Sequence, residues 1–232
     1  MKAMVVSDLL VAKKYLLPQM VIGILVGLFI SVTMQSLYAT LPAIGVMIPF
    51  SIAFTILSLD ERDHWEQFRL ALPLSRTNIM VGRYASLAVI TLFGLAVGLL
   101  STAVLVVAAT VLPTVPQLTN LTAGLSWEPV MMVSAVALAI GMLMLSVILP
   151  LVARFGMTKA VRFVPLLIIV GVFFAFSSGG NESAPQLLAN LETWSQTPAG
   201  VIGMAAVTLV GSGIVYTLSG ILSIKLYQRR EF

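Results

Sequence analysis

The chain has 232 residues, of which 59% are hydrophobic and only 9% are charged, and its mean hydropathy is +1.05. A soluble domain could not cover so much apolar surface with so few charges, whereas a membrane helix needs only about 20 apolar residues to cross a core of roughly 30 Å, so we expect an all-α integral membrane protein. The absence of cysteine excludes disulfides, cysteine-ligated metals and thiol chemistry, and in this class a net charge of +4 indicates orientation in the membrane rather than nucleic-acid binding.

The N-terminal segment, residues 1–14, is too short and too often interrupted by charge to cross a membrane. Met4 and Leu9 fall near one helical face, which predicts an amphipathic helix lying in the membrane interface. Lys13 and Lys14 would then anchor the start of the first span. A cleaved signal peptide is the alternative, but the many apolar segments that follow favour a retained helix.

Six apolar stretches predict six transmembrane helices in a single domain, residues 1–232. We expect the spans at about residues 16–34, 41–59, 84–112, 129–153, 160–177 and 199–224. The third is longer than the membrane core requires, so it should tilt or project. The fifth is the weakest, because its uninterrupted apolar run from Phe163 to Phe176 reaches only about 21 Å.

The outer segment before the last span, residues 178–198, has the pattern of a short helix. Pro185 suits a first helical turn. An apolar stripe follows, made of Leu187, Leu188, Leu191 and Trp194. We expect this helix to lie in the outer interface or to dip into it as a re-entrant piece; a structureless loop is the alternative.

Positive charge falls on one side of this map. All 13 Lys and Arg residues lie in the N-terminal segment, the loop between the second and third spans, the turn after the fourth span and the C-terminal tail. The only charged residues in the three loops on the other side are Glu128, Glu182 and Glu192. This positive-inside pattern predicts that both termini are cytoplasmic, and it supports six crossings, because without the fifth span the basic tail would lie outside.

The loop between the second and third spans, residues 60–83, is the most polar stretch, and we call it the elbow. It holds eight of the 22 charged residues, which are 13 basic and 9 acidic. Asp60 stands where an N-cap would, with Asp63 three residues later, so we expect a helix to begin there. Pro73 ends that helix, and Ser75 can cap a second one.

The first elbow helix has an aromatic face. Trp65, Phe68 and Leu72 recur at helical spacing. An ordinary basic cytoplasmic loop needs no such face, so we favour a docking element that a soluble partner binds; an ordinary loop is the alternative. The second elbow helix carries Arg76 and Arg83 into the third span.

The chain lacks the residues that membrane chemistry usually needs. Apart from the weak fifth span, whose first turn holds Arg162, the predicted spans contain no Asp, Glu, Lys, Arg or His, which argues against an ion-coupled carrier. There is no GxxxxGK[ST] loop to hold phosphates, and His64 is the only histidine. No paired-carboxylate or Ser-His arrangement suits a hydrolase, so we expect no enzyme activity and no catalytic, cofactor or metal site on this chain.

Two GxxxG patterns lie inside predicted spans, at Gly23–Gly27 and Gly94–Gly98. Such patterns let two helices approach closely. In a chain with 17 glycines they also arise by chance on lipid-facing surfaces, so both interpretations are open.

The order of the elements and the elbow motif together resemble the membrane subunits of type-2 ABC exporters, in the small bacterial branch without a fused ATPase. The motif consists of Asp60-Glu61-Arg62, Trp65-Glu66, Leu72-Pro73, Ser75-Arg76 and Arg83-Tyr84. It covers about 25 residues, whereas the topological resemblance covers the whole chain.

The resemblance implies a multi-pass permease of the bacterial cell membrane that pairs with a second permease subunit. It also implies a separate ABC ATPase, on which ATP and Mg²⁺ would be bound, with the elbow as the coupling helix seated in a groove of that ATPase. The expected ATPase contacts are Asp60, Glu61, Arg62, Trp65, Glu66, Phe68, Arg69, Leu72 and Pro73. We expect an exported peptide, lipid-like molecule or drug; the alternative is a non-transporting scaffold or regulatory subunit that recruits a soluble protein.

Overall fold

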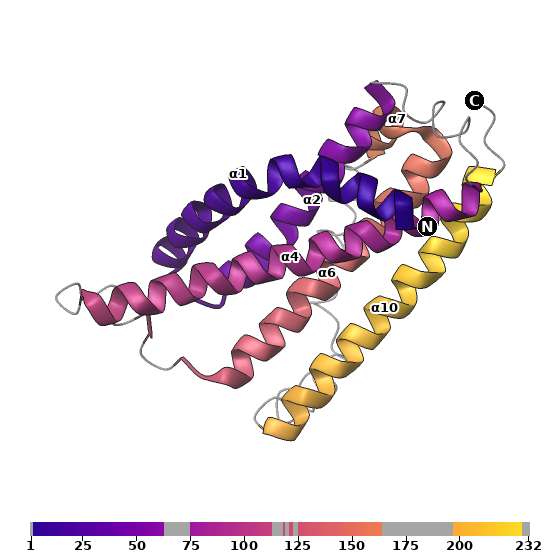
Figure 1. Cartoon of the computed structure of the whole chain (residues 1–232). Coiled ribbons are helices and arrows are strands. Elements are labelled where there is room, and N and C mark those ends of the chain that lie inside the picture. The colour runs from indigo at the N-terminus through magenta and orange to yellow at the C-terminus, as the bar shows by residue number, and fades with distance from the viewer. Residues whose placement is uncertain are drawn as a thin grey trace.

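The computed structural model describes residues 2–62, 75–112, 118, 121–122, 125–163 and 197–228, and the regular structure of these residues is helical throughout. Five long helices lie side by side in one bundle (Figure 1). They are α1 (Lys2–Met34), α2 (Thr40–Arg62), α4 (Arg76–Val111), α6 (Trp127–Phe155) and α10 (Pro198–Gln228). A short helix, α7 (Met157–Ala160), and a 3₁₀ turn, η1 (Val161–Phe163), follow α6.

The five long helices are each long and apolar enough to cross a membrane. Four of them contain a predicted span whole, and α4 covers its span except for the last residue; the extension beyond the span is largest at the N-terminal ends of α1 and α4. The shortest, α2, has 23 residues and is about 35 Å long, enough for the apolar core. Of the predicted fifth span only residues 160–163 are described, and the rest of it, with the outer segment 178–198 up to residue 196, lies outside the described residues.

The N-terminal segment differs from the prediction, because α1 is one continuous helix from Lys2 to Met34, with Pro18 inside it. It runs antiparallel to α2. The Gln19 side chain donates to Ser51 Oγ at 2.8 Å midway along the pair, and Ser31 bonds to Thr40 at the far end. The predicted division between an interfacial helix and a span beginning at residue 16 is therefore not a break in the helix, and an interfacial position of its first turns stays a prediction.

Both GxxxG patterns lie at helix interfaces, which decides the question left open by the sequence. A Cβ added at Gly23 would lie 2.8 Å from Ile48 Cδ1, and one at Gly94 would lie 2.6 Å from Pro49 Cδ. Gly27 is packed at least as closely, against Ser101 and α2. The missing side chains therefore let α1 and α4 approach α2, as small residues do in membrane bundles.

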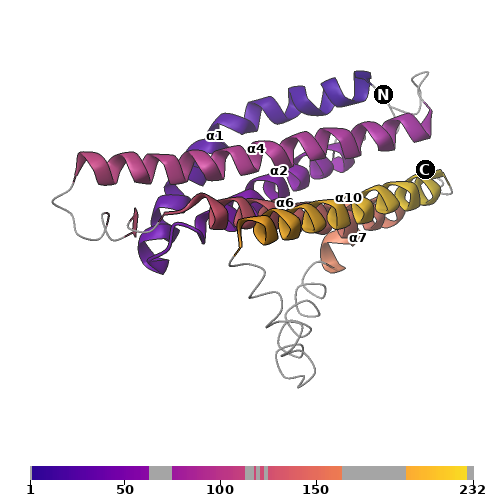
Figure 2. The same ribbon diagram turned by 90° about the horizontal axis from the view of Figure 1, so that it is seen from below.

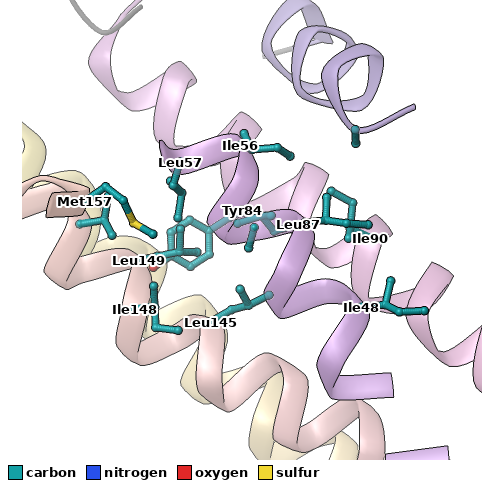
Figure 3. Close-up of a cluster of buried hydrophobic side chains, with 14 of the residues drawn as sticks. Ile48, Ile56, Leu57, Tyr84, Leu87, Ile90, Leu145, Ile148, Leu149 and Met157 are labelled. Atoms are coloured by element: carbon teal, nitrogen blue, oxygen red, sulfur yellow. The ribbon is translucent and has the colours of Figure 1, made fainter. Parts of the chain in front are cut away.

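The apolar core is centred on α2, which packs against α1, α4 and α6. Its isoleucines at positions 44, 48, 52 and 56 recur every fourth residue and are all buried, so they form one continuous ridge. Leu87 and Ile90 of α4 and Leu145 and Leu149 of α6 meet this ridge (Figure 3). Interlocking branched side chains of this kind give a membrane bundle its van der Waals contact.

Helices α6 and α10 run in the same direction, as the colour gradient of both ribbons shows (Figure 1). Ser219 Oγ of α10 donates to the Ser146 carbonyl at 2.6 Å, and near the ends of the two helices Tyr227 packs with Ala153. The end of η1 and the start of α10 therefore lie at opposite ends of the bundle. The chain between them, residues 164–196, lies outside the described residues, so the predicted fifth span, and with it a total of six crossings, stays a prediction.

Helix α2 ends, and α4 begins, at one end of the bundle, which we call the elbow end. The view turned by 90° shows the N-terminal end of α1 and the C-terminal end of α10 at this same end (Figure 2). Helix α7 also lies there, because its Thr158 contacts Glu61 near the end of α2. Because α6 ends two residues before α7 begins, all five long helices have an end at the elbow end.

Candidate functional site

The elbow is described only at its two flanks. Residues 63–74 lie outside the described residues, and with them the predicted contacts Trp65, Glu66, Phe68, Arg69, Leu72 and Pro73. The described flanks are Asp60, Glu61 and Arg62, which form the end of α2, and the residues from Ser75 onward.

The second elbow helix begins as predicted. Ser75 has extended backbone angles, φ −70° and ψ 145°, and its Oγ accepts from the Asn78 N–H at 3.2 Å. It is therefore the N-cap of α4, where its oxygen satisfies one of the amides that the first turn leaves unpaired.

The predicted N-cap at Asp60 is wrong. Asp60 lies inside α2, two residues before its end at Arg62, so the helix that ends the second span runs on through Asp60 and Glu61. An acid in the last turn faces the negative end of the helix dipole, which is unfavourable. Capping reasoning failed because both acids have partners on other helices, and such partners are invisible in the sequence.

Three charged side chains form a buried cluster at the elbow end. Arg83 Nε lies 3.2 Å from Asp8 Oδ2, and Arg83 Nη2 donates to Asp60 Oδ2. Ser86 Oγ donates to Asp8 Oδ2 at 2.9 Å. The exposed fractions of Asp8, Arg83 and Asp60 are 1%, 6% and 7%. Because charges this deeply buried must be paired, the cluster binds α1, α2 and α4 to one another.

The sequence analysis missed this cluster. It found no ionisable residue inside a span, yet all three members lie on helices apolar enough to cross a membrane. The helices extend past the predicted spans and bring Asp8, Asp60 and Arg83 into the bundle. The available signal was Asp8, a single acid within an apolar N-terminal stretch, since an isolated acid in such a setting calls for a basic partner.

Glu61 joins the end of α2 to α7. Its carboxylate accepts from the Thr158 N–H at 2.9 Å and from the Thr158 hydroxyl. Thr158 is in the first turn of α7, where backbone N–H groups have no partner within the helix. The carboxylate therefore caps α7 from another element and links the elbow to the basic turn after α6.

Arg76 joins the start of α4 to the end of α10. Its Nη1 donates to the Gln228 carbonyl at 2.9 Å and to the Tyr227 carbonyl at 3.4 Å. Gln228 Nε2 in turn donates to Thr77 Oγ1 at 3.3 Å. A cation at the carbonyl end of a helix is favourable both for hydrogen bonding and for the helix dipole.

A second polar group lies deeper, between α4 and α10. Tyr84 Oη lies 2.8 Å from Ser219 Oγ and 2.7 Å from Ser223 Oγ. Tyr216 Oη donates to the Tyr84 carbonyl at 2.7 Å, and the two tyrosine rings are 4.9 Å apart. These hydroxyls fix the contact of α10 with α4 in a region where apolar side chains do not distinguish one helix from another or from lipid.

An open groove of about 1080 Å³ runs along α2 from Phe50 to Arg62 and is bordered by α7. Phe50 and Phe54 line its apolar part, their rings 4.4 Å apart. Ser58, Glu61 and Arg62 line the part nearest the elbow. The charged side chains of its described lining, Glu61 and Arg62, are thus both at the end nearest the elbow, although apolar Met157 and Val161 line that end as well.

The comparison with known families agrees with this architecture. The sequence model of the family described as ABC-2 family transporter protein matches residues 3–228. The chain belongs to the ABC-2 transporter family. The resemblance stated from the elbow motif is therefore confirmed at the level of the family, and the ABC-2 protein is a multi-pass membrane component of transport rather than a catalyst itself.

Membership of the ABC-2 family implies an ABC ATPase as partner and a dimeric assembly. No curated protein matches the chain. Of the nine predicted ATPase contacts, the structure places Asp60 in the buried cluster, Glu61 in α2 with its carboxylate bonded to Thr158 of α7, and Arg62 at the end of α2 beside the groove. Their contact with an ATPase stays a prediction.

Proposed function

We propose that this ABC-2 permease is the membrane subunit of an exporter driven by a separate ATPase, and that the ATPase acts on the elbow. The observation that carries the proposal is the set of polar contacts on both flanks of the elbow. The flank before residue 63 is bound through Glu61 to α7 and through Asp60 to Arg83. The flank after residue 74 is bound through Arg76 to α10.

Through these contacts, a movement of the elbow would be transmitted to the helices bonded to its two flanks. Hydrogen bonds that involve a charged group are directional and are roughly twice as strong as hydrogen bonds between neutral groups, so they fix the position of the groups that they join. A displacement of residues 63–74 would therefore carry the ends of α2, α4, α7 and α10 with it. A surface loop serving only as a linker would need none of these contacts.

The groove on α2 supports an amphipathic cargo. Its apolar part, with Phe50 and Phe54, suits a hydrocarbon chain or an apolar side chain. Its polar part, with Ser58 and Arg62, suits a headgroup or a peptide backbone. A peptide, lipid-like molecule or drug with one polar end fits this arrangement better than a small ion.

In the assembly we propose, two permease subunits, identical or related, each bind one ATPase in the bacterial cell membrane. Both termini and the elbow face the cytoplasm, where ATP is present. ATP and Mg²⁺ are held by the ATPase. Closure of the two ATPases moves the elbows and shifts α2 and α4 of one permease against its mate.

Replacement of the predicted aromatic anchors tests this function. We expect Trp65→Ala with Phe68→Ala to reduce the amount of ATPase that co-purifies in mild detergent by about 10-fold or more, because each buried aromatic anchor at an interface contributes roughly 2 kcal/mol or more. The measurement is the ratio of ATPase to permease in the eluate.

The matched control is Trp127→Ala, which removes an aromatic side chain that is 55% exposed at the opposite end of the bundle. It should leave the ratio unchanged. Full co-purification with both elbow aromatics removed would overturn the elbow as the docking element. Recovery of a soluble partner other than an ATPase would instead favour the scaffold.

A further inference from the structure

The buried charge cluster joins α1 to α2 and α4, the two helices that the elbow connects. We propose that Arg83 is a positioning residue that ties α1 to the elbow, so that the elbow half of α1 moves with α2 and α4 when the ATPase pulls. The inference rests on the proposed function and adds a third helix to the moving part of each subunit.

The first observation is where the members lie along the chain. Asp60 precedes the elbow segment 63–74 by three residues, and Arg83 follows it by nine. These two residues are therefore on the two helices that the elbow joins. The third member, Asp8, is on α1, more than fifty residues earlier in the chain.

The second observation is the way one guanidinium serves both carboxylates. Its Nε contacts Asp8 and its Nη2 contacts Asp60. The planar fork of an arginine fixes the direction of each bond, whereas a lysine is a point charge that can pair over a range of directions. The relative position of α1 and α2 at the elbow end is therefore set through one rigid group on α4.

The third observation is how α1 contacts the bundle elsewhere. Its first turns also pack on the core through apolar side chains, with Ala12 fully buried and Leu9 and Leu16 partly buried, and its next described hydrogen bond to another helix is the neutral one of Gln19. Leu10, one turn or less from Asp8, is 64% exposed. Without the cluster, the first turns of α1 would thus be held mainly by apolar contacts, which permit sliding.

The number of charges in the cluster allows one carboxylate to be removed as a test. Two carboxylates share one arginine, and Ser86 supplies a further hydrogen bond to Asp8. Replacement of Asp8 by Asn leaves a neutral Asp60–Arg83 pair, so the variant should still fold. Replacement of Arg83 by Gln would leave two buried carboxylates without their cation, and is a poor test because loss of folding is expected.

The test measures distances in the complete complex. Because the chain has no cysteine, single cysteines at Leu10 on α1 and Leu143 on α6 take spin labels cleanly. The labelled permease is diluted with unlabelled permease, purified with its ATPase and placed in lipid nanodiscs. The Leu10–Leu143 distance is measured without nucleotide and with ATP, Mg²⁺ and vanadate.

We expect the wild-type distance to shift with nucleotide and Asp8→Asn to lose most of that shift. ATPase binding should be unchanged and the rate of ATP hydrolysis should stay within about twofold, because the elbow itself is intact. Arg83→Lys, which keeps the charge but not the fork, should fall between the two. Gln19→Leu, which removes a neutral bond between α1 and α2, is the matched control and should shift as the wild type does.

An equal shift in Asp8→Asn and wild type, or no movement of α1 in the wild type, overturns the proposal. A second measurement uses the permease alone, with labels at Leu10 and at Leu92 on α4. There Asp8→Asn should broaden the distance distribution, and an unchanged width also overturns the proposal. Failure of any ATPase to bind would contradict the proposed function. The width of the Leu10–Leu92 distance distribution in the permease alone would still test whether Asp8 and Arg83 hold α1 against α4.

Discussion

At the scale of single residues, the bundle depends on the smallest side chains and on a few charged ones. Gly27 lies where α1 meets both α2 and α4, so even one methyl group there would overlap Ser101 and Ile44. Arg83 lies where the same three helices meet, two turns into α4. Close approach comes from the absence of a side chain in the first case, and direction comes from a rigid charged group in the second.

We predict that Gly27→Ala lowers the stability of the permease in detergent. The added Cβ would lie 2.9 Å from Thr40 Cγ2 and closer still to Ser101 and Ile44, and overpacking of this kind costs about 1–3 kcal/mol. The measurement is the thermal unfolding midpoint followed by circular dichroism, at fixed detergent and protein concentration.

Gly211→Ala is the matched control, since a Cβ at Gly211 meets nothing within 4 Å. It should be neutral or slightly stabilising, because alanine is favoured over glycine inside a helix by about 1 kcal/mol. Equal midpoints for the two variants would contradict the close packing of α1 against α2 and α4.

At the scale of whole helices, α10 differs from α2. Helix α2 is surrounded by other helices and buries one ridge of isoleucines, whereas α10 leaves many apolar side chains exposed, among them Val207, Val210 and Leu218. Its contact with α4 is fixed by the hydroxyl groups of Tyr84, Ser219 and Ser223. In lipid, apolar contact alone does not favour helix association over lipid contact, so these polar bonds decide how α10 is placed.

We predict that Tyr84→Phe weakens the contact of α10 with the bundle. The tilted ring contact with Tyr216 is retained while both hydroxyl bonds are lost, and the expected loss is about 0.6–1.7 kcal/mol, between the average and the maximum found for such bonds in a membrane bundle. The thermal midpoint should fall accordingly.

A double-mutant cycle with Ser219→Ala tests whether the two residues act through one bond. The pair should lose less stability than the sum of the single variants, since the bond is already absent after the first change. Thr217→Ala is the control, because Thr217 is exposed and its hydroxyl bonds within its own helix to the Ile214 carbonyl. If the stability losses of Tyr84→Phe and Ser219→Ala add exactly, the two residues do not act through one bond.

At the scale of the whole molecule, the described helices place the elbow, α7 and the C-terminal end of α10 at one end of the bundle. The charge distribution predicts that this end is cytoplasmic. The parallel course of α6 and α10 puts Thr197 and Lys159 at opposite ends. Crossing number and orientation can therefore be tested by the accessibility of the two positions.

We predict that a membrane-impermeant maleimide added to intact cells labels Gln35→Cys and Thr197→Cys but not Lys159→Cys. All three side chains are exposed, and the chain has no other cysteine to compete. Lys159→Cys should become reactive once the membrane is opened. Labelling of Lys159→Cys from outside would contradict the predicted orientation, and protection of Thr197→Cys alone would contradict the predicted fifth span.

Much of the bundle could be predicted from the sequence. Length and hydropathy suffice to locate membrane helices, because a span must bury its backbone in its own hydrogen bonds and present an apolar surface along about 30 Å. The cap at Ser75 was also predictable, because its hydrogen-bond partner, Asn78, is only three residues away in the chain. The elbow motif also indicated the family, which the match over residues 3–228 confirms.

What the sequence determined by itself is thus local: which segments are apolar and where a cap begins a helix. The side of the membrane on which the positive charges lie stays a prediction. Only the tertiary structure decided what the charges at the helix ends do. Asp60 has the pattern of an N-cap but lies inside α2 and pairs with Arg83, and Asp8 joins them from another helix. The reason is physical: an ion pair between residues 8 and 83 depends on how three helices pack, and one-dimensional spacing does not record that packing.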